Sequence, residues 1–182
     1  MRLEPLTKEQ CEIVRVWRNN TLETLRTPYP LTEEMQADFF KNVINNRNSP
    51  HRYWSIIEGV GEFADVEHRL IGMGGLTGIQ WENRIAEISL IIDPALRNKG
   101  YGKQAVALLL DEGFKRMNLQ TIFGECYQVN ESGCKFWENI VTTYNGYMCV
   151  LPKRKFWNGQ FWDSMYFSID TEEFRKVKPL NS

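Results

Sequence analysis

The sequence contains no long apolar segment, few cysteines and histidines, and no excess of charge of either sign. None of its apolar runs approaches the ~20 residues that a membrane-spanning helix needs. The four cysteines, at positions 11, 126, 134 and 149, form no Cys-x-x-Cys pair, and only two histidines are present. We therefore predict no metal site. A net charge of −1 gives no basis for general nucleic-acid binding or for attraction to an anionic membrane.

The composition is that of a globular domain of ordinary size. Hydrophobic residues make up 42% and charged residues 25% of the 182 residues, enough to bury a full core. No repeat, low-complexity tract or linker interrupts the chain, so we predict a single domain over residues 1–182. The first residues, Met1-Arg2-Leu3-Glu4-Pro5, lack the apolar core of a signal peptide. Unpaired thiols used as small core residues fit a reducing compartment, so a cytoplasmic protein is expected.

Helical and extended patterns alternate along the chain. Strands are expected at 2–6, 53–58, 69–80, 84–92 and 121–127, followed by two more around Asn158-Gly159, a dipeptide typical of two-residue hairpin turns. Helices are expected at 8–19, 32–44 and 102–117 and after Asn130, and a polar hairpin tip at 59–68. This order predicts an α/β domain with a mixed sheet.

The apolar residues of the three earlier helices have the spacing of buried faces. The residues expected to point inward are Ile13, Val14, Val16 and Trp17; Met35, Phe39, Phe40 and Val43; and Val106, Leu109, Leu110, Phe114 and Met117.

The most informative segment follows the strand at 84–92. It reads Arg97-Asn98-Lys99-Gly100-Tyr101-Gly102-Lys103, a loop that opens onto a helix. The two glycines allow the backbone to approach a ligand, and the helix start presents free N–H groups. Such a cradle suits a phosphate or a pyrophosphate. It is not a nucleotide P-loop, because Gly-Lys-Ser/Thr is absent.

This segment resembles the Gln/Arg-x-x-Gly-x-Gly/Ala signature of the general N-acetyltransferase (GNAT) superfamily. Downstream, Asn130-Glu131-Ser132-Gly133-Cys134-Lys135-Phe136-Trp137-Glu138-Asn139 is similar to the superfamily's Asn-x-x-Ser/Ala/Gly-x-x-Leu/Phe-Tyr-Glu-Lys segment. The resemblance implies a mixed, mostly antiparallel central sheet with splayed central strands flanked by helices. The two chain ends loosely resemble the branch of ribosomal-protein N-terminal acetyltransferases, which also includes polyamine, sugar-amine and antibiotic acetyltransferases.

The resemblance also implies acetyl-CoA as cofactor and CoA as product. The pantetheine arm would lie between the strands at 84–92 and 121–127, and a backbone N–H near Ile91 or Ile92 would stabilise the oxyanion. The implied cofactor-binding residues are Leu90, Ile91, Ile92, Arg97, Asn98, Lys99, Gly100, Tyr101, Gly102, Lys103, Asn130, Ser132 and Trp137.

The catalytic groups are less well defined. The acceptor amine must lose a proton, and Glu125 is the first candidate for the base, with Glu87 on the facing strand as the second. Many family members carry a tyrosine seven residues after the asparagine, where this chain has Trp137. An indole cannot supply a proton at neutral pH, so Tyr127, Tyr144 or water remain as alternatives for the acid.

The acceptor site is expected between the early helices and the last hairpin. Aromatic and cationic residues there are Trp17, Arg26, Tyr29, Trp54, Trp81, Phe156, Trp157, Phe161 and Trp162. Residues 153–155, Lys-Arg-Lys, are expected to be a solvated charge cluster.

The resulting hypothesis is an acetyl-CoA-dependent N-acetyltransferase that acts on a primary amine of a small molecule or a peptide. The acceptor could be a protein N-terminus, a polyamine, an amino sugar or another small amine. The alternatives are a CoA-binding module with little catalysis and an acyltransferase for another acyl group. No membrane or general nucleic-acid partner is expected, and pairing of the aromatic final hairpin would give a homodimer.

Overall fold

A computed structural model describes residues 1–59 and 69–177. Within these residues, seven strands form one sheet in the order β1-β2-β3-β4-β5-β7-β6. Of the strand pairs in this sheet, β4 and β5 alone are parallel and the others are antiparallel. The strands are β1 (Arg2–Pro5), β2 (Arg52–Glu58), β3 (Arg69–Gln80), β4 (Ile85–Ile92), β5 (Thr121–Tyr127), β6 (Tyr147–Trp157) and β7 (Gln160–Asp170). The expected α/β fold with a mixed, mostly antiparallel sheet is confirmed.

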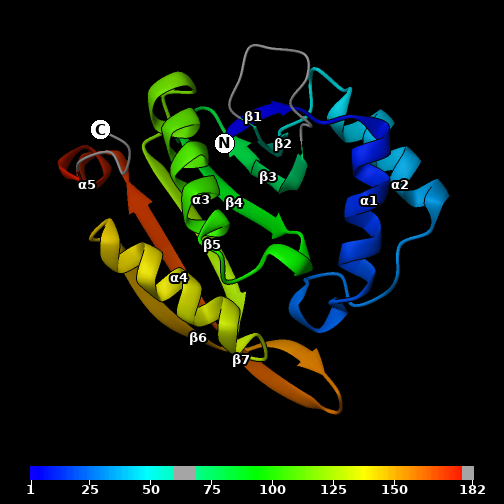
Figure 1. The fold of residues 1–182 in the computed structure, drawn as a ribbon. Coiled ribbons are helices and arrows are strands. Elements are labelled where there is room, and N and C mark those ends of the chain that lie inside the picture. The colour runs from blue at the N-terminus through cyan, green and yellow to red at the C-terminus, as the bar shows by residue number, and fades with distance from the viewer. Residues whose placement is uncertain (60–68, 178–182) are drawn as a thin grey trace.

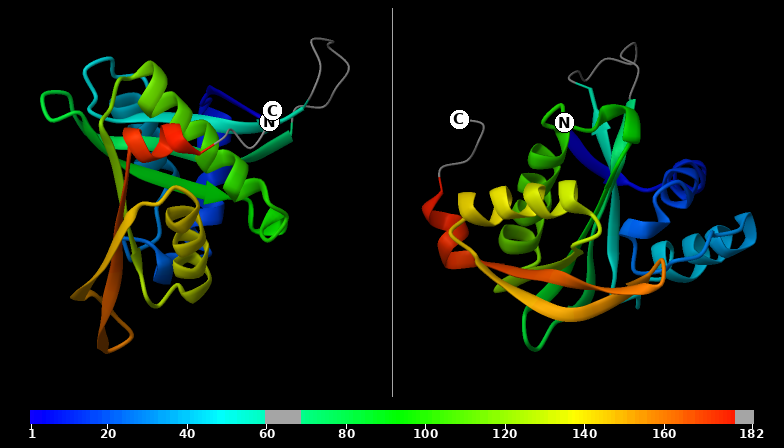
Figure 2. Two further views of the ribbon diagram at one scale, coloured as in Figure 1. Left: turned by 90° about the vertical axis from the view of Figure 1, so that its left-hand side faces the viewer. Right: turned by 90° about the horizontal axis from the view of Figure 1, so that it is seen from below.

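Helices cover both faces of this sheet (Figure 1). In the view from below, α3, α4 and α5 lie on one face and α1 and α2 on the other (Figure 2). The helices are α1 (Lys8–Asn19), α2 (Glu33–Phe39), α3 (Tyr101–Asp111), α4 (Glu131–Thr143) and α5 (Thr171–Lys176). A π-helical turn extends α2 over Phe40–Ile44 and another extends α3 over Glu112–Arg116, while short 3-10 turns lie at Leu22–Thr24 and Pro94–Leu96. Among the described residues, no helix is long and apolar enough to cross a bilayer.

Local sequence signals account for several of these boundaries. Thr7 caps α1, because its side chain accepts from Gln10 N–H while the Gln10 side chain accepts from Thr7 N–H. Thr32 caps α2 through a hydrogen bond that its side chain accepts from the Met35 N–H. Asn158 and Gly159 have φ values of 50° and 78° and join β6 to β7, as expected for a two-residue turn. The predicted polar tip at 59–68 falls almost wholly outside the described residues.

The main core lies between the sheet and the pair α3 and α4. It contains Val106, Leu109, Leu110 and Phe114 from the α3 region, as predicted, and Met117 packs against its edge. The buried cysteines Cys11 and Cys126 belong to cores, whereas Cys134 and Cys149 are partly exposed. All four thiols are free.

The predicted inner faces of α1 and α2 are partly wrong. Val14 is buried as predicted, but Ile13 and Val16 are 44% and 48% exposed, because Cys11 packs beside Val14 in their place. Met35 is 42% exposed, and its neighbour Gln36 is buried. The Gln36 amide can be buried because it donates to the Cys11 carbonyl oxygen at 2.9 Å.

Candidate active site

The central strands β4 and β5 separate after their first three residues. Residues 85–87 of β4 pair with residues 121–123 of β5, and no pairing continues along the rest of these two strands. The backbone ladder therefore opens at the middle of the sheet, which confirms the predicted splay. Two cavities lie at this opening: one is lined by residues of α3 and α4, and the other by residues of α1 and α2.

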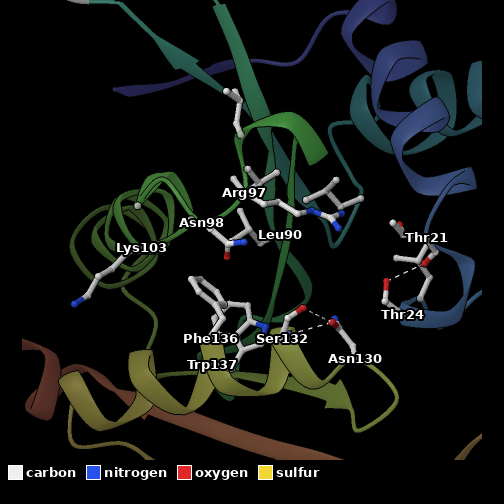
Figure 3. A pocket seen from close by; sticks show the side chains of 17 residues that line it. Thr21, Thr24, Leu90, Arg97, Asn98, Lys103, Asn130, Ser132, Phe136 and Trp137 are labelled. Atoms are coloured by element: carbon white, nitrogen blue, oxygen red, sulfur yellow. Dashed lines mark hydrogen bonds between the residues drawn. The ribbon is translucent and has the colours of Figure 1, made fainter.

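The first cavity lies between the C-terminal end of β4, the start of α3 and the start of α4 (Figure 3). Its volume is about 270 Å³. In Figure 3 the side chains of Phe136 and Trp137 point from α4 toward Leu90, and Arg97 lies above them. The cavity thus has an apolar base and a cationic entrance.

The entrance has the structure expected of an anion cradle. Gly100 is the N-cap of α3, with a φ of 85° that favours glycine. Among the described residues, the N–H groups of Tyr101, Gly102 and Lys103 donate to no other backbone group, so they are available to a ligand. Arg97 and Lys103 line the cavity and are exposed. These donors fit a phosphate or a pyrophosphate.

Asn130 closes the cavity on the side of α4. Its Oδ1 accepts hydrogen bonds from the Gly133 N–H at 3.0 Å and from the Ser132 hydroxyl at 3.3 Å, so it caps α4. A Cβ at Gly133 would lie 2.2 Å from Asn130 Nδ2, which explains a glycine at this position. Because the cap uses Oδ1, the amide nitrogen remains available to a ligand that carries carbonyl groups.

Most residues implied by the resemblance line this cavity. They are Leu90, Ile91, Ile92, Arg97, Asn98, Gly100, Gly102, Lys103, Asn130, Ser132 and Trp137. Lys99 and Tyr101 do not line it, and the Tyr101 hydroxyl donates to Glu58 at 2.5 Å. Six further residues line the cavity and were not expected from the sequence: Thr21, Thr24, Leu25, Leu96, Gly133 and Phe136. The sequence of the segment after α1 contains no motif that indicates a cofactor site. Gly133 and Phe136, in contrast, belong to the motif that resembles the family's asparagine segment.

A second cavity, of about 300 Å³, is lined by residues of α1 and α2 and by residues of β4 and β5. It shares six lining residues with the first: Thr24, Leu25, Leu90, Ile91, Asn130 and Trp137. Leu90 and Ile91 lie on β4 where it has separated from β5, so the two cavities adjoin at the opening in the sheet. Of the aromatic and cationic residues named for the acceptor region, only Arg26 lines this second cavity.

Both candidate bases line the second cavity and are bridged by one arginine. Arg26 donates to the two Glu87 oxygens, at 2.6 and 3.2 Å, and its Nη2 lies 3.7 Å from Glu125 Oε2. Glu125 Oε1 also accepts from the Ser164 hydroxyl at 2.6 Å and from Arg154 Nε at 3.0 Å. The side chain of Glu125 is 9% exposed, against 22% for Glu87, so Glu125 is the more enclosed carboxylate.

These contacts keep Glu125 ionised. Desolvation by burial raises the pKa of Glu125, but the hydrogen bonds from Ser164 and Arg154 lower it. The positive charges of Arg154 and Arg26 act in the same direction. The net pKa is below the usual value for a glutamate, so the carboxylate is available as a proton acceptor at neutral pH.

The expected solvated cluster at 153–155 is wrong for Lys155, which is 6% exposed. Lys153 and Arg154 are exposed, and Arg154 also pairs with Glu125. The Lys155 ammonium donates to the Leu25 carbonyl oxygen and lies 5.0 Å from the Tyr127 ring centroid and 5.5 Å from that of Trp157. Lys155 therefore attaches the segment that carries Arg26 to the β6–β7 hairpin.

The two tyrosines considered as proton donors lie in different surroundings. Tyr127, at the end of β5, is buried and lines the second cavity. Tyr144 stacks on Phe174, with ring centroids 5.6 Å apart, and lines neither cavity. Trp137 lines both cavities and stacks on Phe167 at 4.6 Å, so it forms part of the junction. Within the described residues, no cluster of histidine, cysteine and carboxylate side chains could hold a metal ion.

Known proteins with similar sequences are acetyltransferases. A sequence model described as "Acetyltransferase (GNAT) domain" matches residues 1–140. An uncharacterized N-acetyltransferase, YnaD of Bacillus subtilis (strain 168), is 33% identical over 90 residues, which span 48% of this chain and 50% of that protein. Spermidine N(1)-acetyltransferase of Vibrio cholerae is 26% identical over 136 residues, or 75% of this chain and 71% of that protein.

Solved structures of spermidine N-acetyltransferase from Vibrio cholerae share the fold. A complex with CoA and spermine has a TM-score of 0.80 at 20% identity and covers 95% of this chain and 96% of that one. A mutant form of that enzyme has a TM-score of 0.78 at 21% identity, over 100% of this chain and 98% of that one. Taken with the match over residues 1–140, the splayed sheet and the anion cradle identify this chain as a member of the GNAT acetyltransferase family, whose cofactor is acetyl-CoA.

Proposed function

We propose that this protein transfers the acetyl group of acetyl-CoA directly to the primary amine of a small molecule. The observation that carries the proposal is the junction of the two cavities at the splay. The first cavity offers donors for a pyrophosphate and an apolar base for the pantetheine arm. The second is lined by Glu125 and Glu87 and shares residues with the first at this opening. A thioester and an amine entering through the two cavities would meet there.

The residues of the chain have separate tasks in this reaction. Arg97, Lys103 and the start of α3 bind the phosphates, and Asn130 orients the pantetheine amides. The amine nitrogen forms a bond to the acetyl carbon while the carbon–sulfur bond breaks. The proton lost by the amine passes to Glu125, directly or through water. Tyr127 or water returns a proton to the released thiolate.

A panel of amines tests this proposal. The chain would be incubated with acetyl-CoA and spermidine, spermine, amino sugars, amino acids or short peptides, and the released thiol would be followed. Amine-dependent thiol release, with an acetylated product identified by mass spectrometry, is the expected result. If acetyl-CoA binds but no amine releases CoA faster than hydrolysis, the alternative of a CoA-binding module gains support.

Reversal of one cradle charge is expected to weaken acetyl-CoA binding. Arg97→Glu places a carboxylate beside the phosphates and should raise the dissociation constant about tenfold or more. Lys99→Glu makes the same change on an exposed neighbour that does not line the cavity, so it should change the constant little. Calorimetric titration of both variants gives the comparison. Equal effects of the two would mean that the phosphates lie elsewhere.

Lys155 is expected to position the acceptor side of the site. Lys155→Met removes the hydrogen bond to Leu25 and should loosen the segment that carries Arg26, raising the acceptor KM several-fold. The affinity for acetyl-CoA should be unchanged, because Lys155 does not line the first cavity. Lys153→Met, at an exposed position of the same hairpin, serves as the control. Unchanged acceptor kinetics in Lys155→Met would contradict the positioning role.

A further inference from the structure

The second cavity contains one cation without an anionic partner. Four charged side chains line this cavity: Arg18, Arg26, Glu87 and Glu125. Arg26 bridges the two carboxylates, and Arg154 adds a second cation to Glu125. Across the described residues 1–59 and 69–177, the guanidinium of Arg18 has no hydrogen bond or ion pair.

The surroundings of Arg18 make this unpaired charge costly. Arg18 is half-buried near the end of α1, and the cavity around it is lined by Val14, Phe39 and Met73. Burial lowers the pKa of the Arg18 guanidinium, and the nearby Tyr53 phenol only partly offsets this effect. A cation withdrawn from water without a counter-charge is unfavourable unless a ligand supplies one.

Tyr53 lines the same cavity as Arg18, Glu87 and Glu125. Burial raises the pKa of the Tyr53 phenol, and the charges of Arg18, Glu87 and Arg26 also act on it, so these three groups lie near one phenol. One small ligand in the cavity could therefore contact Arg18 and the carboxylate pair together. Arginine binds carboxylate and phosphate groups with two parallel hydrogen bonds, which suits an anionic group on such a ligand.

We propose that the acceptor carries an anionic group, a carboxylate or a phosphate, that binds Arg18 while its amine lies at Glu125. This inference rests on the proposed acetyl transfer. It also argues against a polyamine without an anionic group as the acceptor. The positive charges of a polyamine would be repelled by Arg18, and the two carboxylates already pair with Arg26 and Arg154.

Matched amines that differ only in the anionic group test the inference. A series of ω-amino carboxylates of increasing length would each be compared with the corresponding carboxamide, and glucosamine phosphate with glucosamine. Spermidine would be the polycation. In the wild type, kcat/KM for at least one anionic amine should exceed that of its neutral partner about 30-fold. Comparison of the amino carboxylates with glucosamine phosphate shows which anion is preferred.

The variants assign this preference to Arg18. Arg18→Gln should reduce the ratio to about one by raising KM for the anionic amine, and Arg18→Lys should restore part of it. The affinity for acetyl-CoA and the midpoint of thermal unfolding report whether Arg18→Gln remains folded. A wild type that acetylates spermidine best, or a ratio that Arg18→Gln does not change, would overturn the inference and leave the acetyl transfer intact. Binding of acetyl-CoA with no transfer to any amine would overturn both.

Discussion

Replacement of Glu125 by glutamine is expected to lower kcat for acetyl transfer by about 10²–10³-fold. The amide keeps the size of the side chain and can still accept a hydrogen bond from Ser164, but it cannot take the amine proton. Because Glu125 does not line the cofactor cavity, the affinity for acetyl-CoA should not change. Steady-state kinetics and a titration with acetyl-CoA measure the two effects.

The other carboxylate provides the comparison. Glu87→Gln should mainly raise the acceptor KM, because Glu87 holds Arg26 through two hydrogen bonds and is more exposed than Glu125. Glu82→Gln, at an exposed turn outside both cavities, should have no effect. If Glu87→Gln lost the larger part of kcat and Glu125→Gln lost little, the base would be Glu87.

The dependence of the rate on pH follows from the state of Glu125. Since the net pKa of Glu125 lies below the usual glutamate value, the carboxylate is ionised throughout the neutral range. It protonates, and ceases to accept a proton, only at lower pH. The rise of kcat/KM with pH should therefore follow the pKa of the acceptor amine and move with it when the amine is changed. A rise that stayed at one pH for all amines would indicate a titrating protein group instead.

Phe167→Ala is expected to destabilise the fold by about 3–5 kcal/mol. Phe167 in β7 is 1% exposed and stacks on Trp137. It occupies the space that Gly124 leaves on β5, where a Cβ would lie 2.4 Å from its Cζ. Removal of the ring would leave a cavity beneath the junction of the two sites. Denaturant unfolding followed by circular dichroism measures the free energy of unfolding.

A second phenylalanine of the same strand is the control. Phe161 is 61% exposed and contacts Phe156, so Phe161→Ala should cost much less than Phe167→Ala. Phe167→Leu retains most of the buried volume and should fold. Because it removes the ring on which Trp137 stacks, it should lower kcat by changing the position of Trp137. Equal losses of stability in the two alanine variants would contradict the placement of Phe167 in the core.

Sequence patterns with a local physical cause were predicted well. The helix starts near residues 8 and 32 were predicted, and there Thr7 and Thr32 cap the helices through bonds within one turn. The predicted hairpin at Asn158-Gly159 depends on backbone conformation alone. The splay of β4 from β5 and most of the cofactor cavity came from the resemblance of two motifs. These motifs combine glycines, a capping asparagine and cations at fixed spacing, so their structure depends little on distant parts of the chain.

Features that depend on contacts between distant segments were missed. The pairing of β6 with β7 is irregular between Leu151 and Lys155, and Lys153 has a φ of 54°. The alternation of inward and outward side chains along β6 therefore does not predict which way Lys155 points. Its burial depends on Leu25, 130 positions away in the sequence. Likewise, Arg26 reaches Glu87 across 61 positions, and the burial of Gln36 required a carbonyl acceptor on α1 that hydropathy does not encode.

The most direct test is a crystal structure of the complex with a bisubstrate analogue, in which CoA is joined through an acetyl linker to an amine. We expect the pyrophosphate at Arg97 and the start of α3, the pantetheine arm between β4 and β5, and the amine nitrogen within hydrogen-bond distance of Glu125, directly or through one water. An analogue that occupies one cavity alone, or whose nitrogen lies away from both Glu125 and Glu87, would contradict the account of two cavities that meet at the splay.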